Sequence, residues 1–284
     1  MHRILIGFAA LAALLMADSY TDSIHAFQQA RDTGLRSPNG WLTLVGLFWL
    51  KPGDNTIGSA DSNDFVLPKG SAPAQLGTLK LRKDQVTFVK PDGSSQTLSY
   101  GDEKPDVVHE GTISFLIIKR GDKLAVRAKD SASPVLKNFE GMKYFPVNPE
   151  LHFQATFIPE AKKIPILNIL GQTDLEDSPG IVEFAYKGEK YRLRPITEGD
   201  TLFFLYKDAT NKINTYQAGR MLNTPLPANG KVDLDFNKSY NPPCTFTPYA
   251  TCPLPPKENT LPFAVEAGEM RYKNGHADYT ASLK

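Results

Sequence analysis

The sequence predicts a mainly β protein, in which an N-terminal helix is followed by two antiparallel β units. The first unit is expected to be a sandwich, and the second a further sandwich or a barrel. Two observations support this. Short apolar or alternating runs are separated by turn residues along most of the chain, which is typical of sandwiches and barrels. Glycine and proline supply 43 of the 284 residues, and such frequent punctuation favours short strands over long helices.

The chain opens with a pattern that predicts a signal peptide over residues 1–17. His2 and Arg3 precede an apolar run of 13 residues, 4–16, and the small residue Ala17 follows it. This order of a basic start, an apolar run and a small residue is typical of secretory leaders. The run is shorter than the roughly 20 residues that span a bilayer. We therefore expect a periplasmic or secreted protein, with no membrane insertion after cleavage.

The charge balance excludes a broad class of partners. Without residues 1–17, which contain one arginine and no acidic residue, 31 basic side chains face 31 acidic ones. Nucleic-acid binding requires a clustered basic footprint, so no nucleic-acid partner is expected.

The helix is predicted over residues 20–33, within an N-terminal lead-in of residues 18–40. Ile24 and Phe27 lie three residues apart on one helical face, and Thr21 or Asp22 is suited to cap its start. Gly34 follows the helix, where a left-handed residue often ends one.

The first β unit is predicted over residues 41–130 and a linker over 131–150. The unit begins with WLTLVGLFWL at 41–50 and continues in short runs such as QVTFVK and KLAVRAKD. The linker is rich in proline, glycine and serine and has little periodicity. Alternating runs resume in the second β unit, predicted over 151–284, for example GIVEFAYKG and TLFFLYKD.

The two cysteines are predicted to form a disulfide. Cys244 and Cys252 are the only cysteines of the chain, and a cysteine pair in an exported protein is most often bridged. They enclose a short loop within a proline-rich stretch, so the bridge would fix its local shape.

Several blocks resemble a known family. GWLTLVGLFWLKPGDNTIGS, DFVLPKGSAPAQLGTLKL and the block of residues 208–269 are similar to the bacterial family called domain of unknown function 1684. This resemblance implies no established activity. Residues 45–128 also resemble the opening of a forkhead-associated sandwich, a phosphothreonine-binding fold. That family has an arginine after its glycine, whereas Ser59 follows Gly58 here, so the resemblance implies the shape and not phosphopeptide binding.

Familiar catalytic motifs are absent from the sequence. It contains no G-x-S-x-G, H-E-x-x-H, G-x-x-x-x-G-K-[ST] or G-x-G-x-x-G. The histidines of the mature chain are widely spaced and none has a metal-ligand pattern: His25, His109, His152 and His276. No metal or other cofactor is expected, and a Ser-His-Asp triad would require a spatial coincidence.

The segment VDLDFN at 232–237 is the most informative candidate site. In a strand, three apolar residues point one way, and Asp233, Asp235 and Asn237 point the other. Asp and Asn form strands poorly, so the pattern suggests ligand binding, although a solvated strand face remains an alternative. An EF-hand is excluded because its sixth and twelfth positions are Lys238 and Cys244. An irregular calcium site that includes Asn241 stays open.

Further polar and aromatic residues fall within about 60 positions of this segment. We predict Asp235 and Glu269 as a carboxylate pair for acid–base catalysis. The predicted ligand-binding residues are Asp208, Tyr216, Arg220, Asn237, Asn241, Asn259 and Glu266. Aromatic faces together with carboxylates, amides and an arginine suit sugars or other polar small molecules.

Three functions follow from these residues. The first is an exported protein that binds a polar small molecule or glycan through its C-terminal domain. The second is a hydrolase that uses Asp235 and Glu269. The third is a structural scaffold, in which the polar block is buried and bonded internally. The residues alone leave enzyme and non-enzyme both open.

Overall fold

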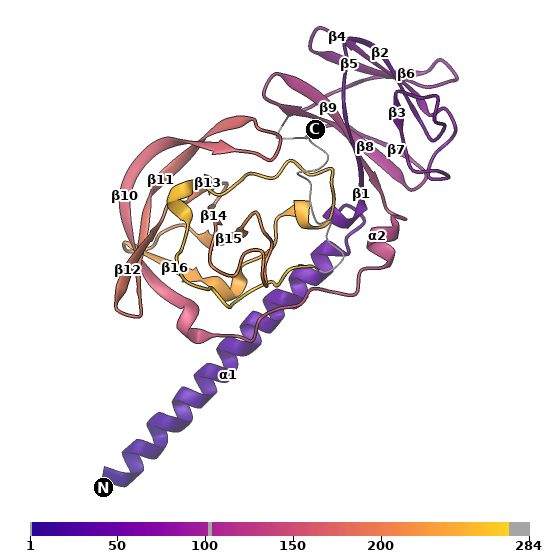
Figure 1. Ribbon diagram of the computed structural model, residues 1–284. Coiled ribbons are helices and arrows are strands. Elements are labelled where there is room, and N and C mark those ends of the chain that lie inside the picture. The colour runs from indigo at the N-terminus through magenta and orange to yellow at the C-terminus, as the bar shows by residue number, and fades with distance from the viewer. Residues whose placement is uncertain (1, 102–103, 273–284) are drawn as a thin grey trace. The chain divides into compact units, whose positions relative to one another are not determined.

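The protein consists of two compact units in a computed structural model, which describes residues 2–101 and 104–272, with the backbone alone for 2–17 (Figure 1). The sandwich unit comprises residues 35–140 together with 246–251. The C-terminal unit comprises the N-terminal helix up to residue 34 together with 141–245 and 252–272.

The longest element is the helix α1 (His2–Leu35), which contains the predicted helix of residues 20–33. The other helical elements are short: η1 (Trp41–Thr43), α2 (Pro134–Lys137), η2 (Pro149–Leu151), η3 (Phe236–Lys238), η4 (Pro243–Thr245) and η5 (Lys257–Asn259). Ser133 caps α2, and its hydroxyl accepts a hydrogen bond from the Val135 amide. Within the described ranges, no helix is long and apolar enough to cross a bilayer.

The sandwich unit contains two sheets. The four-stranded sheet has the order β1-β9-β8-β7 and the five-stranded sheet the order β3-β2-β4-β5-β6. Their strands are β1 (Leu44–Trp49), β2 (Gly53–Gly58), β3 (Phe65–Val66), β4 (Gly77–Arg82), β5 (Gln85–Val89), β6 (Ser95–Leu98), β7 (Val107–Glu110), β8 (Ile113–Arg120) and β9 (Lys123–Asp130). All pairings are antiparallel except the short one between β2 and β3.

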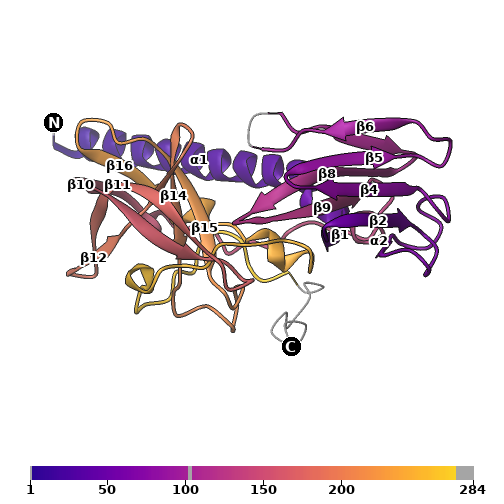
Figure 2. The same cartoon turned by 90° about the horizontal axis from the view of Figure 1, so that it is seen from above.

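One hydrophobic core joins these two sheets, and Figure 2 shows their strands from above. Phe88 of β5 and Phe115 of β8 meet edge to face, with ring centroids 5.2 Å apart. In β8, Ile113, Phe115 and Ile117 are buried, whereas the intervening residues are more exposed. This period of two is what packing one sheet face against another requires.

The C-terminal unit contains two further sheets. One has the order β12-β11-β10-β16 and the other β13-β14-β15. Their strands are β10 (His152–Leu167), β11 (Thr173–Tyr186), β12 (Glu189–Leu193), β13 (Ile196–Glu198), β14 (Thr201–Tyr206), β15 (Arg220–Pro225) and β16 (Lys231–Asp235). The long β10–β11 hairpin curves along one side of this unit (Figure 1).

An aromatic core fills the C-terminal unit. Phe236 packs against Phe153, Phe184 and Tyr206, with centroid distances between 5.3 and 6.0 Å. Among the described residues no sheet closes into a barrel. The mainly β fold with an N-terminal helix and antiparallel sheets is therefore confirmed.

Candidate functional site

The predicted site strand VDLDFN forms β16 and the first residues of η3. Val232, Leu234 and Phe236 point into the aromatic core, as the alternation predicts. The opposite face is not uniformly solvated, because Asp235 and Asn237 are also buried, each only 1% exposed. Tyr20 of α1 covers them, so this strand is buried on both faces at its end.

Asp235 is the centre of a hydrogen-bond network. Its Oδ1 accepts from the Tyr20 hydroxyl at 2.9 Å and from the Asn237 amide nitrogens at 3.0 Å. Its Oδ2 lies 3.5 Å from the Lys238 ammonium. Asn237 also binds the Asn148 backbone through both its carbonyl and its amide. Burial, and then the charge of Asp235, raises the pKa of Tyr20. The phenol therefore stays protonated and donates to the carboxylate.

Glu269 belongs to a second network, also closed by α1. Its Oε1 accepts from Arg31 Nε at 2.8 Å, and its Oε2 accepts from the Asn241 backbone and side-chain amides at 2.7 and 2.9 Å. Gly268 precedes it with φ +73°, and a Cβ there would collide with the Ser239 carbonyl oxygen. This glycine therefore allows the close approach that places Glu269, which is fully buried.

Arg220 and Asp208 form a third network. Arg220 Nη2 lies 2.8 Å from Asp208 Oδ2, and both side chains are fully buried. The guanidinium also donates to the carbonyls of Val265 and Ala267. The other oxygen of Asp208 accepts from Thr210 and from the Val265 amide. The ion pair therefore ties the loop after β14 to the C-terminal segment.

The remaining predicted residues divide into buried and exposed ones. Asn259 is buried and bridges the backbones of Arg194 and Leu205 through three hydrogen bonds. Tyr216 is buried, and this burial raises the pKa of its phenol. Glu266 is exposed. The fold thus places Asp235 and Glu269 in different networks, with different partners from α1.

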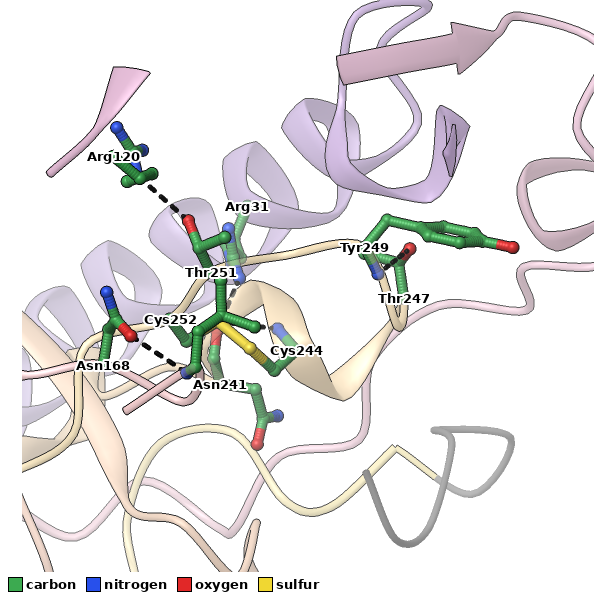
Figure 3. The surroundings of a disulfide bond; sticks show 10 residues. Arg31, Arg120, Asn168, Asn241, Cys244, Thr247, Tyr249, Thr251 and Cys252 are labelled. Atoms are coloured by element: carbon green, nitrogen blue, oxygen red, sulfur yellow. Dashed lines mark hydrogen bonds between the residues drawn. A yellow bond between two sulfur atoms is a disulfide. The ribbon is translucent and has the colours of Figure 1, made fainter. Parts of the chain in front are cut away.

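The predicted disulfide between Cys244 and Cys252 is confirmed (Figure 3). The segment after Cys252 continues against the end of β10, where the Ile169 amide donates to the Cys252 carbonyl and the Leu254 amide to the Leu167 carbonyl. Inside the loop, the Tyr249 amide donates to the Thr247 hydroxyl. The bridge therefore anchors a proline-rich segment to the sheet.

The cavity beside these residues is small. It measures about 10 Å³ and is lined by Arg220, Tyr216, both cysteines and several prolines. About 10–15 Å³ is the least that holds one water molecule. Among the described residues, no group of three or more His, Cys, Asp or Glu side chains is arranged to hold a metal ion. This region is thus a bonded polar core with room for about one water molecule.

A larger pocket lies on the outer face of the four-stranded sheet of the sandwich unit. Its volume is about 170 Å³. Two cross-strand rows form its floor: His109 pairs with Ser114 and Ser114 with Lys129, while Leu116 pairs with Arg127 one step along. Side chains two residues apart on a strand share a face, so both rows point to the same side. The lining residues are Asn39, Val107, His109, Ser114, Phe115, Leu116, Arg127 and Lys129.

Two cations dominate the electrostatics of this pocket. Burial, and then the charge of Arg120, lowers the pKa of Arg127 to about 10. Burial, and then the charge of Arg127, lowers the pKa of Lys129. Burial therefore imposes a free-energy cost on the charged form of both side chains, and Arg127 stays protonated near neutral pH.

The sequence does not predict this pocket. The run KLAVRAKD predicts a strand, and its alternation places Arg127 and Lys129 on one face. The available signal was a pair of cations two residues apart on a strand face. This signal indicates a pocket only once the strand pairing is known, because the pairing brings Ser114 and His109 beside the two cations. Of the other histidines, His152 contacts Asp233 at 2.5 Å, His25 is exposed on α1, and His276 lies outside the described residues.

Together, the fold and these sites describe a β protein of two units, with a bonded polar core in the C-terminal unit and an open basic pocket in the sandwich unit. Residues 137–270 match the family model described as "Protein of unknown function (DUF1684)". The predicted resemblance to domain of unknown function 1684 is thereby confirmed for this part of the chain, and the similar blocks at 40–81 lie outside the match. A search of curated proteins found no significant match.

One similar solved structure is the solution structure of an uncharacterized protein from Haloarcula marismortui. It is 29% identical to this chain over 47% of this chain and 78% of that one, with a TM-score of 0.40.

Proposed function

We propose that the protein is an exported, non-catalytic binding protein that takes a small polar ligand in the basic pocket of the sandwich unit. The single observation that carries this proposal is the pocket of about 170 Å³ whose floor presents polar and charged side chains to the outside. Well-formed concave sites with a few convergent polar groups are the usual places for small ligands.

The C-terminal unit serves as a scaffold in this proposal. Binding of a glycan there, or hydrolysis by Asp235 and Glu269, requires groups that a ligand can reach. Both carboxylates are buried and bonded to side chains of α1 and to neighbouring amides. The adjoining cavity of about 10 Å³ has no room for a sugar. The geometry therefore supports the scaffold for this unit better than a site.

Export is supported by two features. The apolar run of residues 4–16 has the length of a leader, and a disulfide joins the only two cysteines. Expression of the full chain in a bacterium, followed by fractionation and N-terminal sequencing, tests this part. We expect the mature chain to begin at Asp18 and to lie outside the cytoplasm, and an uncleaved cytoplasmic chain would contradict export.

Ligand binding is tested by filling the pocket. A panel of neutral sugars, carboxylates and phosphate is screened for increases in the melting temperature of the mature chain. Leu116→Trp places a large ring in the pocket and should abolish every increase, whatever the ligand's charge. Thr87→Trp, on the five-stranded sheet of the same unit, is the control. If no compound stabilises the wild type, or if Leu116→Trp responds normally, the pocket is not a binding site.

The Asp235→Asn variant distinguishes a ligand site in the pocket from a ligand site in the C-terminal unit. The variant should bind the same compounds as the wild type, because Asp235 belongs to the C-terminal unit. Loss of ligand binding in a folded Asp235→Asn variant would instead support a site in the C-terminal unit.

A further inference from the structure

The ligand class follows from the donors and charges of the pocket. Of the described residues that line it, none is an Asp or Glu, whereas Arg127 and Lys129 are cationic and His109 lies at the exposed edge. A neutral sugar would leave both cations without a counter-charge. An anion would offset the cost of burying them.

Arg127 has no partner of its own within the described residues apart from an aromatic ring. Its Nε is buried and lacks a hydrogen-bond acceptor, and no ion pair among residues 2–101 and 104–272 includes it. Its guanidinium carbon lies 5.6 Å from the centroid of the Trp41 ring, a cation–π contact. The Nε atoms of Arg220 and Arg194 also lack an acceptor, but each of these two guanidinium groups contacts a carboxylate, and Arg127 has none among the described residues. An unpaired buried donor in a native protein calls for an explanation, and a ligand provides one.

Lys129 is oriented toward the same space. Its ammonium donates to the Asn39 carbonyl at 2.7 Å, which leaves two further protons for a ligand. Ser114 lies directly opposite Lys129 across β8 and β9, and both side chains line the pocket. The guanidinium fork, the ammonium and the hydroxyl together form a donor set that matches the oxygens of one oxyanion.

The size of the pocket restricts the ligand further. Its volume of about 170 Å³ is smaller than the roughly 300–1,000 Å³ of pockets for drug-sized molecules. A single compact anionic group fits this space better than an oligosaccharide.

We propose that this pocket binds a small oxyanion of the phosphate or sulfate type between Arg127 and Lys129, with Ser114 as a further donor. This inference rests on the proposed binding function and adds the chemical class of the ligand. The oxyanion is either free or carried as a group on a small molecule, and the two sources are separated by experiment.

Calorimetric titration of the mature chain tests the ligand class. The probes are inorganic phosphate, glucose 6-phosphate and glucose, in a chloride buffer without other oxyanions. We expect saturable binding of phosphate and none of glucose, with affinity falling as ionic strength rises. Tighter binding of glucose 6-phosphate than of phosphate identifies a carried group, and the reverse identifies the free ion.

Charge-matched variants test the residues. Arg127→Met and Lys129→Met should each weaken phosphate binding at least about tenfold, because each removes a charge-assisted hydrogen-bond donor. Arg82→Met and Lys123→Met remove the same charges from exposed positions of the same unit and should leave the affinity unchanged. Arg127→Lys keeps the charge without the fork and should give an intermediate loss. Amide chemical shifts should change along the row of Ser114 and Lys129.

The outcomes distinguish the two claims. If glucose binds in the pocket and phosphate does not, the oxyanion inference falls and the binding function survives. If neither phosphate nor glucose binds, and no compound of the wider panel raises the melting temperature, both the oxyanion inference and the proposed binding function are wrong. Equal weakening in Arg82→Met and Arg127→Met would mean non-specific attraction and would overturn the inference. If Arg127→Met does not fold, Arg127→Lys and Lys129→Met decide.

Discussion

Two arginines occupy opposite environments in this protein. In the C-terminal unit, Arg220 is 1% exposed and bonded to Asp208 and to two backbone carbonyls. In the sandwich unit, Arg127 is partly buried, faces a pocket and lacks a carboxylate or carbonyl partner among the described residues. The comparison shows that burial of a charged side chain does not by itself indicate a binding site: Arg220 has a carboxylate partner, whereas Arg127 lines a pocket and has no such partner among the described residues.

The largest expected effect is in the closed network. Arg220→Met removes the cation and leaves Asp208 buried without its counter-charge, which should cost about 3–5 kcal/mol of unfolding free energy. Denaturant unfolding of the protein measures it. The double variant Arg220→Met with Asp208→Asn should recover part of the loss. A cost below about 1 kcal/mol would mean that the Arg220–Asp208 ion pair contributes little to stability, and would contradict the contrast between Arg220 and Arg127.

The disulfide should contribute the next largest effect. Cys244 and Cys252 are 8 residues apart, and closing a loop of that length stabilises by about 2–3 kcal/mol in the chain-entropy description. The Cys244→Ser, Cys252→Ser double variant should lose this amount, measured by urea unfolding against the oxidised wild type. Phosphate binding should persist, since the pocket residues belong to the other unit. Loss of binding would contradict the independence of the two regions.

The Tyr20–Asp235 contact should make stability fall at alkaline pH. The pKa of Tyr20 is raised in the folded state by burial and by Asp235, whereas an unfolded tyrosine titrates near pH 10. The unfolded state therefore releases its proton first, and the stabilisation present below about pH 10 is lost as the pH rises further. Urea unfolding between pH 8 and 11 should show this decline.

Tyr20→Phe provides the control for the alkaline decline. It should cost about 1.5 kcal/mol at neutral pH, because a hydrogen bond to a carboxylate is removed, and it should reduce the slope above pH 10. Arg127 and Lys129 act in the opposite sense, because their lowered pKa values make stability rise as they deprotonate. An unchanged slope in Tyr20→Phe would assign the decline to other groups.

The smallest stability change is expected at the open site. Arg127→Met should leave the melting temperature unchanged or raise it slightly, because the lost cation is costly to bury and has only the Trp41 ring to stabilise it. The same substitution at Arg220 should be strongly destabilising. Thermal unfolding of both variants side by side makes the comparison. A large destabilisation by Arg127→Met would mean that Arg127 stabilises the fold, and would contradict its role in an open ligand site.

Local pattern was sufficient for much of the fold. The alternation of Val232, Leu234 and Phe236 predicted a strand with that face in the core, and the structure confirms it. The cysteine pair predicted the disulfide. These features depend on residues close together in the sequence, where periodicity and composition carry the information.

The polar networks could not be predicted in this way. Tyr20 reaches Asp235 across 215 positions, and Arg31 reaches Glu269 across 238. The sequence therefore indicates the two carboxylates as candidate site residues, but it does not indicate their partners on α1. A conspicuous polar face can result either from a ligand or from a helix that covers it, and local sequence does not distinguish them.

By itself the sequence determined the mainly β class, the N-terminal helix, the disulfide and the resemblance of residues 137–270 to domain of unknown function 1684. Only the tertiary structure decided which polar residues are buried and bonded within the protein and which line a pocket. The physical reason is that burial and pairing depend on side chains that folding brings together from distant positions. The free energy of a charge is set by those neighbours, so Arg220 and Arg127 are distinguishable only in the folded protein.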